Sequence, residues 1–468
     1  MILPAPLVAD QPEPPQLRVL AGGNAERQAV TLDRFMAWYD RHFDLVGMLG
    51  NINDGRSLAR VKVPLPTVLL AALTMFWVGM ESVHELEDRL RHNAGLRALL
   101  GRLTDYGKAF CEDTVRAATS VLDPSQLRGL IHAQAKRGTR QWGARYCADC
   151  ELAARLRPIH ASALAAKLVI AIDGHELHSS PTRCCDDCRQ RTRTVQRGGK
   201  AVAVVEYYHT IVVAQWVGTH PALVLDFEPV KPGKGELSTA YRLLERLGRQ
   251  YGDEIGIVLA DALYDCNPWR TLARKHGYRL VHAHRDTRRD PGRTARRELD
   301  ARDRRREKPD ITYRDVRNGN HYAVWEQTIR EGSQRYIEAI RTGKDGTVHK
   351  AVIITDLPVV SASAVAAVIL YETRWWIENS AFHELAGRWS FDHAFVHKGR
   401  PAAVLTFVAL AILAFNAMHV YVYRHLHRQP GVRPRPLSAY RADLRETMIL
   451  CSRRRYREEY AAALAHDP

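Results

Sequence analysis

The hydrophobic pattern changes its period near Ala166, and this change leaves few architectures open to the chain. Residues 32 to about 136 carry apolar side chains at helical spacing, whereas the segments after Ala166 form short apolar or alternating runs. Five such segments predict strands: "KLVIAID", "AVAVVEYYHTIVVAQWV" as one long strand or a strand pair, "ALVLDFEPV", "IGIVLAD" and "YRLVHAH". Amphipathic segments at residues 236–251 and 268–276 predict helices that separate the last three strands.

A polar helix is predicted after these strands, at residues 370–385, "LYETRWWIENSAFHEL". At 100° per residue Tyr371, Arg374 and Glu378 share one face of it, although this spacing is typical of an apolar core stripe. The complete order is three strands, two helix–strand units, an interruption and this helix. It predicts an α/β protein with a ribonuclease-H-like mixed sheet flanked by helices. We expect a β-rich insertion in the interruption and an all-α domain before the sheet.

Two aspartates stand where predicted strands end. Asp173 follows the apolar run "KLVIAI", and Asp261 ends "IGIVLAD". Carboxylates at the ends of adjacent strands meet at the rim of a sheet, and with Glu378 they form an anionic oxygen set that suits two Mg²⁺ or Mn²⁺ ions. Such ions can activate a water or a 3′-hydroxyl and stabilise the leaving oxygen of a phosphodiester. The sequence therefore predicts Asp173, Asp261 and Glu378 as catalytic residues and metal ligands.

Each of these residues also has a purely structural interpretation. A strand-end aspartate often caps the following helix, and Arg374 with Glu378 at i, i+4 can form a surface ion pair. Their joint occurrence in this order favours the catalytic interpretation. In it, Arg374 holds a phosphate oxygen of bound DNA and Tyr371 donates to the same backbone.

These motifs resemble those of the DDE transposases of bacterial insertion sequences, in the branch with a Tyr-x2-Arg-x3-Glu-x6-Lys signature. The similarity runs through "AIDGHEL", "LADALYD" and the polar helix face, and covers roughly residues 167–427. It implies a ribonuclease-H-like catalytic core with a β insertion, Mg²⁺ dependence and cut-and-join chemistry on element ends. It also implies a homodimer, because two element ends must be held together.

The chain departs from this signature at one position. The lysine would fall seven residues beyond Glu378, where the chain has Leu385. Arg388 or Lys398 is then the candidate for the phosphate contact that the signature assigns to the lysine.

The charge balance suits a polyanionic partner, here double-stranded DNA. The net charge is +16, and the surplus is concentrated in two segments. Residues 285–308 have eleven Arg or Lys against six Asp or Glu, and residues 424–459 have ten against four. Arg outnumbers Lys in both, which favours bidentate phosphate contacts. The alternative is a solvated segment laced with ion pairs.

The segment "CEDTVRAATSVL" is a second candidate for DNA contact. With Asp113 or Thr114 as its N-cap and Arg116 in its first turn, it can be the recognition helix of a helix-turn-helix. A plain helical bundle fits the same pattern.

The expected organisation is a disordered Pro-rich segment (1–30), a helical DNA-binding domain (31–140), the first part of the catalytic core (141–284), a basic β-rich insertion (285–357), core helices (358–428) and a basic C-terminal tail (429–468).

The cysteines suggest a structural zinc site. Cys147 and Cys150 form one C-x2-C pair, and Cys185 and Cys188 form another. Two such pairs are the ligand set of a zinc ribbon, although the gap between them is longer than usual. The alternative is a set of reduced cytosolic thiols.

Residues 401–423 are long and apolar enough to be a membrane span. Asn416 and His419 interrupt them, so we expect a buried core helix and no membrane partner. Residues 1–16 do not have the pattern of a cleavable signal peptide, and the protein is expected in the cytoplasm, associated with the nucleoid.

The leading hypothesis is a transposase that binds the terminal inverted repeats of its mobile element and catalyses metal-dependent strand cleavage and strand transfer. Two alternatives stay open. A stand-alone metal-dependent nuclease on the same fold would cut without joining. A non-catalytic DNA-binding protein derived from a transposase would bind without cutting.

Overall fold

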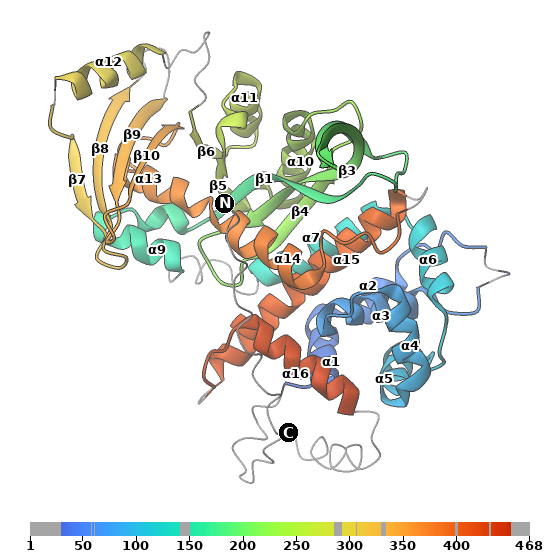
Figure 1. Ribbon diagram of the computed structural model, residues 1–468. Coiled ribbons are helices and arrows are strands. Elements are labelled where there is room, and N and C mark those ends of the chain that lie inside the picture. Colours follow the sequence, from blue (N-terminus) through green and yellow to red (C-terminus); the bar gives the residue numbers. More distant parts are fainter. Residues whose placement is uncertain are drawn as a thin grey trace.

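The computed structural model describes residues 30–57, 59, 61–140, 150–284, 293–305, 307–328, 334–397, 401–429 and 432–450. The part before the sheet is helical throughout its described residues, as predicted. Its helices are α1 (Leu32–Phe43), α2 (Leu45–Gly50), α3 (Leu65–Val78), α4 (Val83–His92), α5 (Ala94–Thr104), α6 (Glu112–Val121), α7 (Pro124–Arg140) and α9 (Glu151–Leu156). Two later helices, α15 (Pro401–Val420) and α16 (Leu437–Leu450), pack against α1, α3, α6 and α7, so the first and the last helices among the described residues build one helical region (Figure 1).

Helix α15 is the apolar helix that passes the length and hydropathy test for a membrane span. Its apolar window is 94% buried inside the protein, which confirms the predicted core helix. The polar interruption has a structural reason. Fully buried Asn416 accepts from the backbone N–H of Val224 (2.9 Å) and donates to the carbonyl of Val224 (2.8 Å). It therefore satisfies two backbone groups of strand β4 (Val224–Pro229) that lie within the core.

Ten strands form one mixed sheet among the described residues. Besides β4 they are β1 (Leu168–Ser180), β2 (Arg189–Arg197), β3 (Lys200–Trp216), β5 (Ile255–Ala260), β6 (Arg279–Ala283), β7 (Ile311–Arg314), β8 (His321–Thr328), β9 (Arg335–Thr342) and β10 (Val348–Thr355). The order is β2-β3-β1-β5-β6-β10-β9-β8-β7, with β4 paired to β3. Strands β1, β5 and β6 are parallel, and β3 is antiparallel to β1.

The predicted alternation of strands and helices is confirmed. Helix α10 (Glu236–Tyr251) connects β4 to β5, and α11 (Asn267–Lys275) connects β5 to β6. The long segment at residues 201–217 forms one strand rather than two. Strand β2 was not predicted, because "RQRTRTVQR" is mostly exposed and has no apolar face, and it is held as a hairpin partner of β3.

The insertion before the last core helices contains α12 (Arg293–Arg304) and the antiparallel strands β7–β10. It continues the main sheet, because β10 pairs with β6. Part of the Arg-rich run forms α12, whose Ala295 and Leu299 pack against Tyr336 and Ile354 in a small core of their own. The predicted β-rich insertion is confirmed, and it extends the central sheet (Figure 1).

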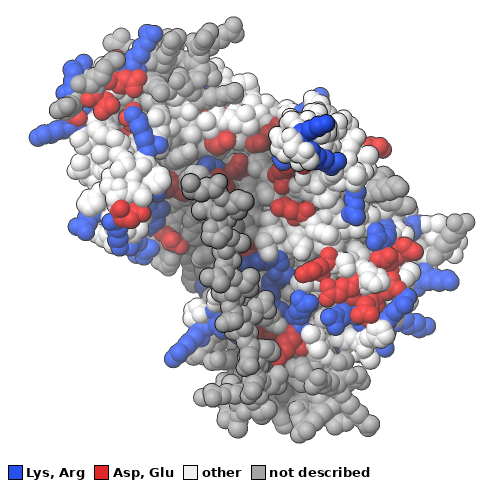
Figure 2. Space-filling view, in the orientation of Figure 1, with Lys and Arg blue, Asp and Glu red and all other residues white. Residues whose placement is uncertain are grey.

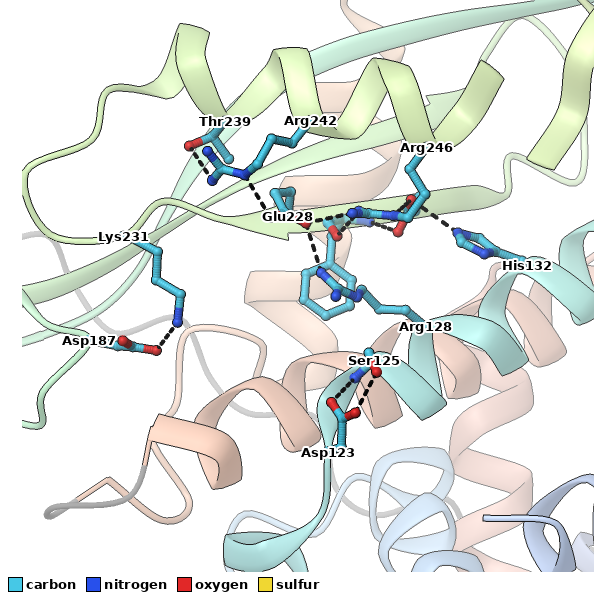
Figure 3. Close-up of polar contacts among 12 residues, drawn as sticks. Asp123, Ser125, Arg128, His132, Asp187, Glu228, Lys231, Thr239, Arg242 and Arg246 are labelled. Carbon is cyan, nitrogen blue, oxygen red and sulfur yellow. Dashed lines mark hydrogen bonds and ion pairs between the residues drawn. The ribbon is translucent and has the colours of Figure 1, made fainter. Parts of the chain in front are cut away.

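A buried network of charges fastens helix α7 to β4 and α10 (Figure 3). Nε of Arg246 lies 2.6 Å from Oδ2 of Asp226, which is fully buried, and Nε2 of His132 lies 3.0 Å from the same oxygen. Glu228 accepts from Arg246 (2.7 Å) and from Arg128 (2.8 Å). The helical region is therefore joined to the sheet by paired charges as well as by apolar packing.

The polar helix of the sequence is interrupted. Helix α13 (Ala364–Thr373) begins at Ser363, whose hydroxyl accepts from the N–H of Ala366 at 3.2 Å. A π-helical segment, Ile377–Phe382, then leads into α14 (His383–Trp389). Single π-helical turns inside α-helices are frequent at functional sites. Glu378 lies in this segment.

Candidate active site

The register of the central strands sets Asp173 beside Asp261. The parallel pairing of β1 and β5 ends with Ala171 opposite Leu259, and each aspartate lies two residues further along its chain. Side chains two residues apart on a strand point to the same face of the sheet. Both aspartates therefore lie two residues beyond the last paired residues, side by side at the same end of the β1–β5 pairing. The sequence placed Asp173 at the end of its strand, which is wrong, because β1 continues to Ser180. What ends at Ala171 is the pairing with β5, since the rest of β1 pairs with β3.

Arg374 connects Asp173 to Glu378. Its Nη1 lies 3.0 Å from Oδ2 of Asp173 and 3.0 Å from Oε1 of Glu378. The two carboxylate oxygens are thus about 6 Å apart at most, twice the distance to the shared nitrogen. Arg374 is 5% exposed, so this ion pair is not the exposed surface pair of the structural interpretation.

Asp173 lies in a strongly anionic environment. Burial raises the pKa of its carboxyl to about 7; the charges of Asp261 and Glu236 add to this effect, while Arg374 and the N–H of Gly174 oppose it. Burial and Asp261 also raise the pKa of Glu236, which accepts from the hydroxyl of Tyr264 at 2.9 Å.

Glu236 is a fourth acidic residue of the site, and sequence reasoning missed it. A Cβ on Gly174 would meet its carboxyl group at 2.3 to 2.9 Å, so the glycine next to Asp173 leaves room for this side chain in its present position. The residue stands at the start of α10, after Gly235. Its only signal in the sequence is an acid in a first helical turn, which also occurs wherever a helix needs charge compensation.

Asp261 has a structural role in the turn that follows β5. Its Oδ1 accepts from the N–H of Leu263 at 2.8 Å and caps the short turn after β5. Two aromatic residues surround Arg374 on the helix side. The guanidinium carbon lies 5.9 Å from the ring centre of Tyr371 and 4.8 Å from that of Trp375, which is 49% exposed.

The structure tests the position of the missing lysine and one of its two predicted substitutes. Leu385 is fully buried in α14, so its position faces the core and not a ligand. Arg388 is exposed on the same helix, and Lys398 lies outside the described residues. Arg116 is in α6 and pairs with Glu112 at 3.2 Å.

The N-cap of α6 differs from the prediction. It is Cys111, whose side chain makes no capping hydrogen bond, and neither Asp113 nor Thr114 occupies that position. The helix therefore begins earlier than the polar residues suggested, and Glu112 and Asp113 fall in its first turn.

A divalent cation fits the acidic cluster. The charge of Asp261 contributes to the raised pKa values of both Asp173 and Glu236, and a single arginine nitrogen serves two carboxylates, which means that negative charge exceeds positive charge at this point. Hard oxygen donors of this kind are the ligands of Mg²⁺ and Mn²⁺. Figure 2 shows acidic side chains near the middle of this face, and Lys and Arg side chains interspersed with acidic ones over the β7–β10 insertion and the N-terminal helices.

The predicted zinc ligands come together only in part. Cys147 lies outside the described residues, and Cys150 begins α9, where its sulfur accepts from the N–H of Ala153 at 3.3 Å. The N–H of Leu152, two residues later, donates to the carbonyl of Gly218, just beyond the end of β3, whereas Cys185 and Cys188 lie beside His209 of that strand. Seven residues of extended strand from His209 to Trp216 span about 23 Å. Cys150 is therefore not in the same cluster.

A comparison with known families agrees with this geometry. The model of the family described as "Transposase DDE domain" matches residues 165–416, which is more than half of the chain and contains Asp173, Asp261 and Glu378. No curated protein matches the sequence. The matched region begins just before β1 and ends in α15, so it includes the sheet, the insertion and the helix with Glu378. The chain belongs to the transposase DDE domain family.

Proposed function

We propose that the protein is the transposase of a mobile element, which binds the terminal inverted repeats of that element and catalyses metal-dependent strand cleavage and strand transfer. Asp173, Asp261 and Glu378 are its catalytic residues. One observation carries this proposal above the others. Buried Arg374 joins the carboxylate of Asp173, on β1, to that of Glu378, in a π-helical turn about two hundred residues later, and Asp261 at the end of the adjacent parallel strand adds its charge beside Asp173, all within the region that matches the family.

The chemistry follows from the donor set. When bound, Mg²⁺ or Mn²⁺ supplies a Lewis acid that activates the attacking water or 3′-hydroxyl and stabilises the leaving oxygen. Asp173, Asp261 and Glu378 are the residues that would hold it, with Glu236 adding negative charge at the base of the site. Two ions would suit this set of ligands.

Arg374 has a positioning role in this proposal. Its single nitrogen holds the carboxylates of Asp173 and Glu378 in a fixed relation, and its burial keeps the guanidinium from solvent. The exposed ring of Trp375 next to it offers a stacking surface for a base or sugar. Tyr371 lies on the other side of the guanidinium and can donate to a phosphate oxygen.

The surface around the site supplies candidates for DNA contact. Arg388 is exposed on α14 and Arg116 on α6, in the helical region that packs on α15. In this proposal double-stranded DNA lies along the face shown in Figure 2, and two copies of the chain act together as a homodimer because two element ends must be joined.

The test is a cleavage and strand-transfer assay with purified protein, Mg²⁺ or Mn²⁺, and labelled DNA that carries the ends of its own element. The wild-type protein is expected to nick at the element boundary and to join the 3′ end to a target. Asp261→Asn is expected to bind the same DNA without cutting it. This change keeps the oxygen that accepts from the N–H of Leu263, so the turn after β5 is preserved.

Asp253→Asn is the matched control. Asp253 is exposed just before β5, at the opposite end of the strand that precedes Asp261, and its replacement is expected to leave cleavage and joining unchanged. Cleavage without joining by the wild-type protein would favour the stand-alone nuclease. Binding that is equal in the wild type and Asp261→Asn, with no cleavage in any metal, would favour the non-catalytic DNA-binding protein.

A further inference from the structure

A second cluster of ligand-type side chains lies outside the carboxylate site. It consists of Cys185, Cys188, His209 and His397, whose ligand atoms all lie within 4.8 Å of one another. Within the described residues it is the one group of three or more His, Cys, Asp or Glu side chains that meets this criterion. None of its members belongs to the proposed catalytic set.

The separations within the cluster match the edges of a tetrahedron around one metal ion. With Zn–S of 2.3 Å and Zn–N of about 2.0–2.1 Å, a tetrahedral site has edges of about 3.8 Å between two sulfurs, about 3.3 Å between two nitrogens and about 3.6 Å between unlike atoms. The two sulfurs are 3.7 Å apart, and Nε2 of His209 is 3.2 Å from Nε2 of His397. Three of the four mixed edges are 3.3 Å (Cys185 to His209), 3.4 Å (Cys188 to His209) and 3.2 Å (Cys188 to His397), and the fourth, from Cys185 to His397, is within 4.8 Å.

The cluster is buried, and its local bonding suits thiolate ligands. Cys188, His209 and His397 are each at most 6% exposed. The N–H of Cys185 donates to the sulfur of Cys188 at 3.3 Å, a contact that stabilises negative charge on that sulfur. Without a cation, two imidazole nitrogens and two sulfurs would face one another in a space closed to water, which is costly. Two thiolates and two neutral imidazoles around Zn²⁺ carry no net charge.

We propose that Cys185, Cys188, His209 and His397 bind a structural Zn²⁺ ion. All four positions are protein ligands, which is the pattern of structural rather than catalytic zinc sites. Cys185 and Cys188 come from the loop between β1 and β2, His209 from β3, and His397 from the segment that follows α14. The ion would therefore tie three parts of the chain together, the last of them 188 residues away from His209.

The contacts around the cluster indicate which chain segments a bound zinc ion would hold together. The segment at residues 390–397 follows the end of α14, the helix next to the π-helical turn with Glu378, and it already contacts β1, where His175 lies 2.8 Å from Asp392 and stacks on Phe391. A metal bond from His397 to β3 fixes the other end of this segment. The loop with the two cysteines also contains Asp187, whose carboxylate pairs with Lys231 at 2.5 Å and fastens the loop to the segment after β4 (Figure 3).

The test measures metal in the full-length protein, without DNA, so its outcome is independent of the proposed transposase activity. The protein is purified under reducing conditions, incubated with Zn²⁺, separated from free metal by gel filtration and analysed by mass spectrometry for zinc. One zinc ion per chain is expected. Replacement by Co²⁺ is expected to give the visible bands of a tetrahedral site and a thiolate-to-metal charge-transfer band.

The variants Cys188→Ser and His209→Ala are expected to lower the zinc affinity by more than about 100-fold, since each removes a direct ligand. Cys184→Ser is the matched control, because Cys184 is an exposed neighbour outside the cluster, and it should keep the zinc ion. His397→Cys is expected to retain the metal with a changed Co²⁺ spectrum, which identifies position 397 as a ligand even where Cys188→Ser fails to fold.

Three results would overturn the proposal. One is a wild-type protein that elutes without zinc. A second is a zinc content that Cys188→Ser and His209→Ala leave unchanged while both remain folded. The third is a disulfide between Cys185 and Cys188 in protein that contains no zinc.

Discussion

Replacing Asp173 by Asn is expected to stabilise the protein at neutral pH, although it removes a residue of the proposed active site. Burial, with help from Asp261 and Glu236, raises the pKa of Asp173 to about 7, whereas an unperturbed aspartate has a pKa of 3.8. Between these values the folded protein holds a proton that the unfolded chain has already released. The free energy of unfolding therefore falls as pH rises through this interval and stays low above pH 7.

The size of the effect follows from the two pKa values. A pKa difference of about 3 corresponds to about 4 kcal/mol between the charged and neutral forms. The Asp173 side chain is only 16% exposed, so solvent screens this contribution weakly. Asparagine has a similar shape and cannot ionise. The free energy of unfolding of Asp173→Asn, relative to the wild type, is expected to rise by about 2–4 kcal/mol between pH 4.5 and pH 8.

The measurement is urea denaturation of both proteins at several pH values, followed by tryptophan fluorescence, in buffer without added Mg²⁺. Asp226→Asn is the control. Burial raises the pKa of Asp226, but His132 and Arg246 outweigh it and hold the pKa below its usual range, so this variant should be destabilised throughout, with no gain at higher pH. Added Mg²⁺ at pH 8 should stabilise the wild type more than Asp173→Asn. A difference between Asp173→Asn and wild type that stays constant from pH 4.5 to pH 8 would refute the reasoning.

Two other substitutions test how the core is assembled. Asn416→Leu leaves the backbone N–H and carbonyl of Val224 without partners, and it should lower the free energy of unfolding by about 2–4 kcal/mol, whereas Thr406→Val in the same helix should cost less than about 1.5 kcal/mol, because it removes one hydrogen bond of 3.3 Å. Equal effects in urea denaturation would contradict this account. Arg335 is 2% exposed and donates to Glu326 and to two backbone carbonyls, so Arg335→Met should cost about 3–5 kcal/mol. A melting temperature within a degree of the wild type would show that these bonds contribute little.

The sequence predicted those parts of the fold that depend on local periodicity. The apolar runs of β1, β5 and β6 form buried parallel strands. Few other structures fit such short apolar runs, so these strands and their order along the chain could be predicted from the sequence. The positions of Asp173 and Asp261 followed from the same runs. Strand β2 has no such signal, because its stability comes from pairing with β3 and not from an apolar face.

The Cys/His cluster proposed to bind zinc shows why half of such a cluster can be predicted and the other half cannot. The C-x2-C spacing of Cys185 and Cys188 is a local signal, and it was recognised. His209 stands in a strand where a histidine has no distinctive neighbours, and His397 is brought to it only by the fold. Pairing the two C-x2-C motifs was the simplest choice along the sequence, but Cys150 lies near the C-terminal end of β3, whereas His209 lies near the middle of this strand.

The position of Glu378 also depends on contacts between residues that are far apart in the sequence. Glu378 lies in a helical segment, whereas the two aspartates of the proposed site lie in or directly after strands of the sheet. Apolar packing alone leaves a helix free to slide or rotate by part of a turn, so polar contacts are needed to define its position. Before the π-helical turn, Glu372 accepts from Arg155 (2.9 Å), Arg341 (3.1 Å) and Tyr322 (2.9 Å), which come from α9, β9 and β8. After it, the segment that ends at His397 is fastened to β1 and β3. The helical segment with Glu378 is therefore held before and after this residue by side chains that are far away in the sequence. For this reason the local sequence predicted the polar helix face but not the contacts that hold it in place.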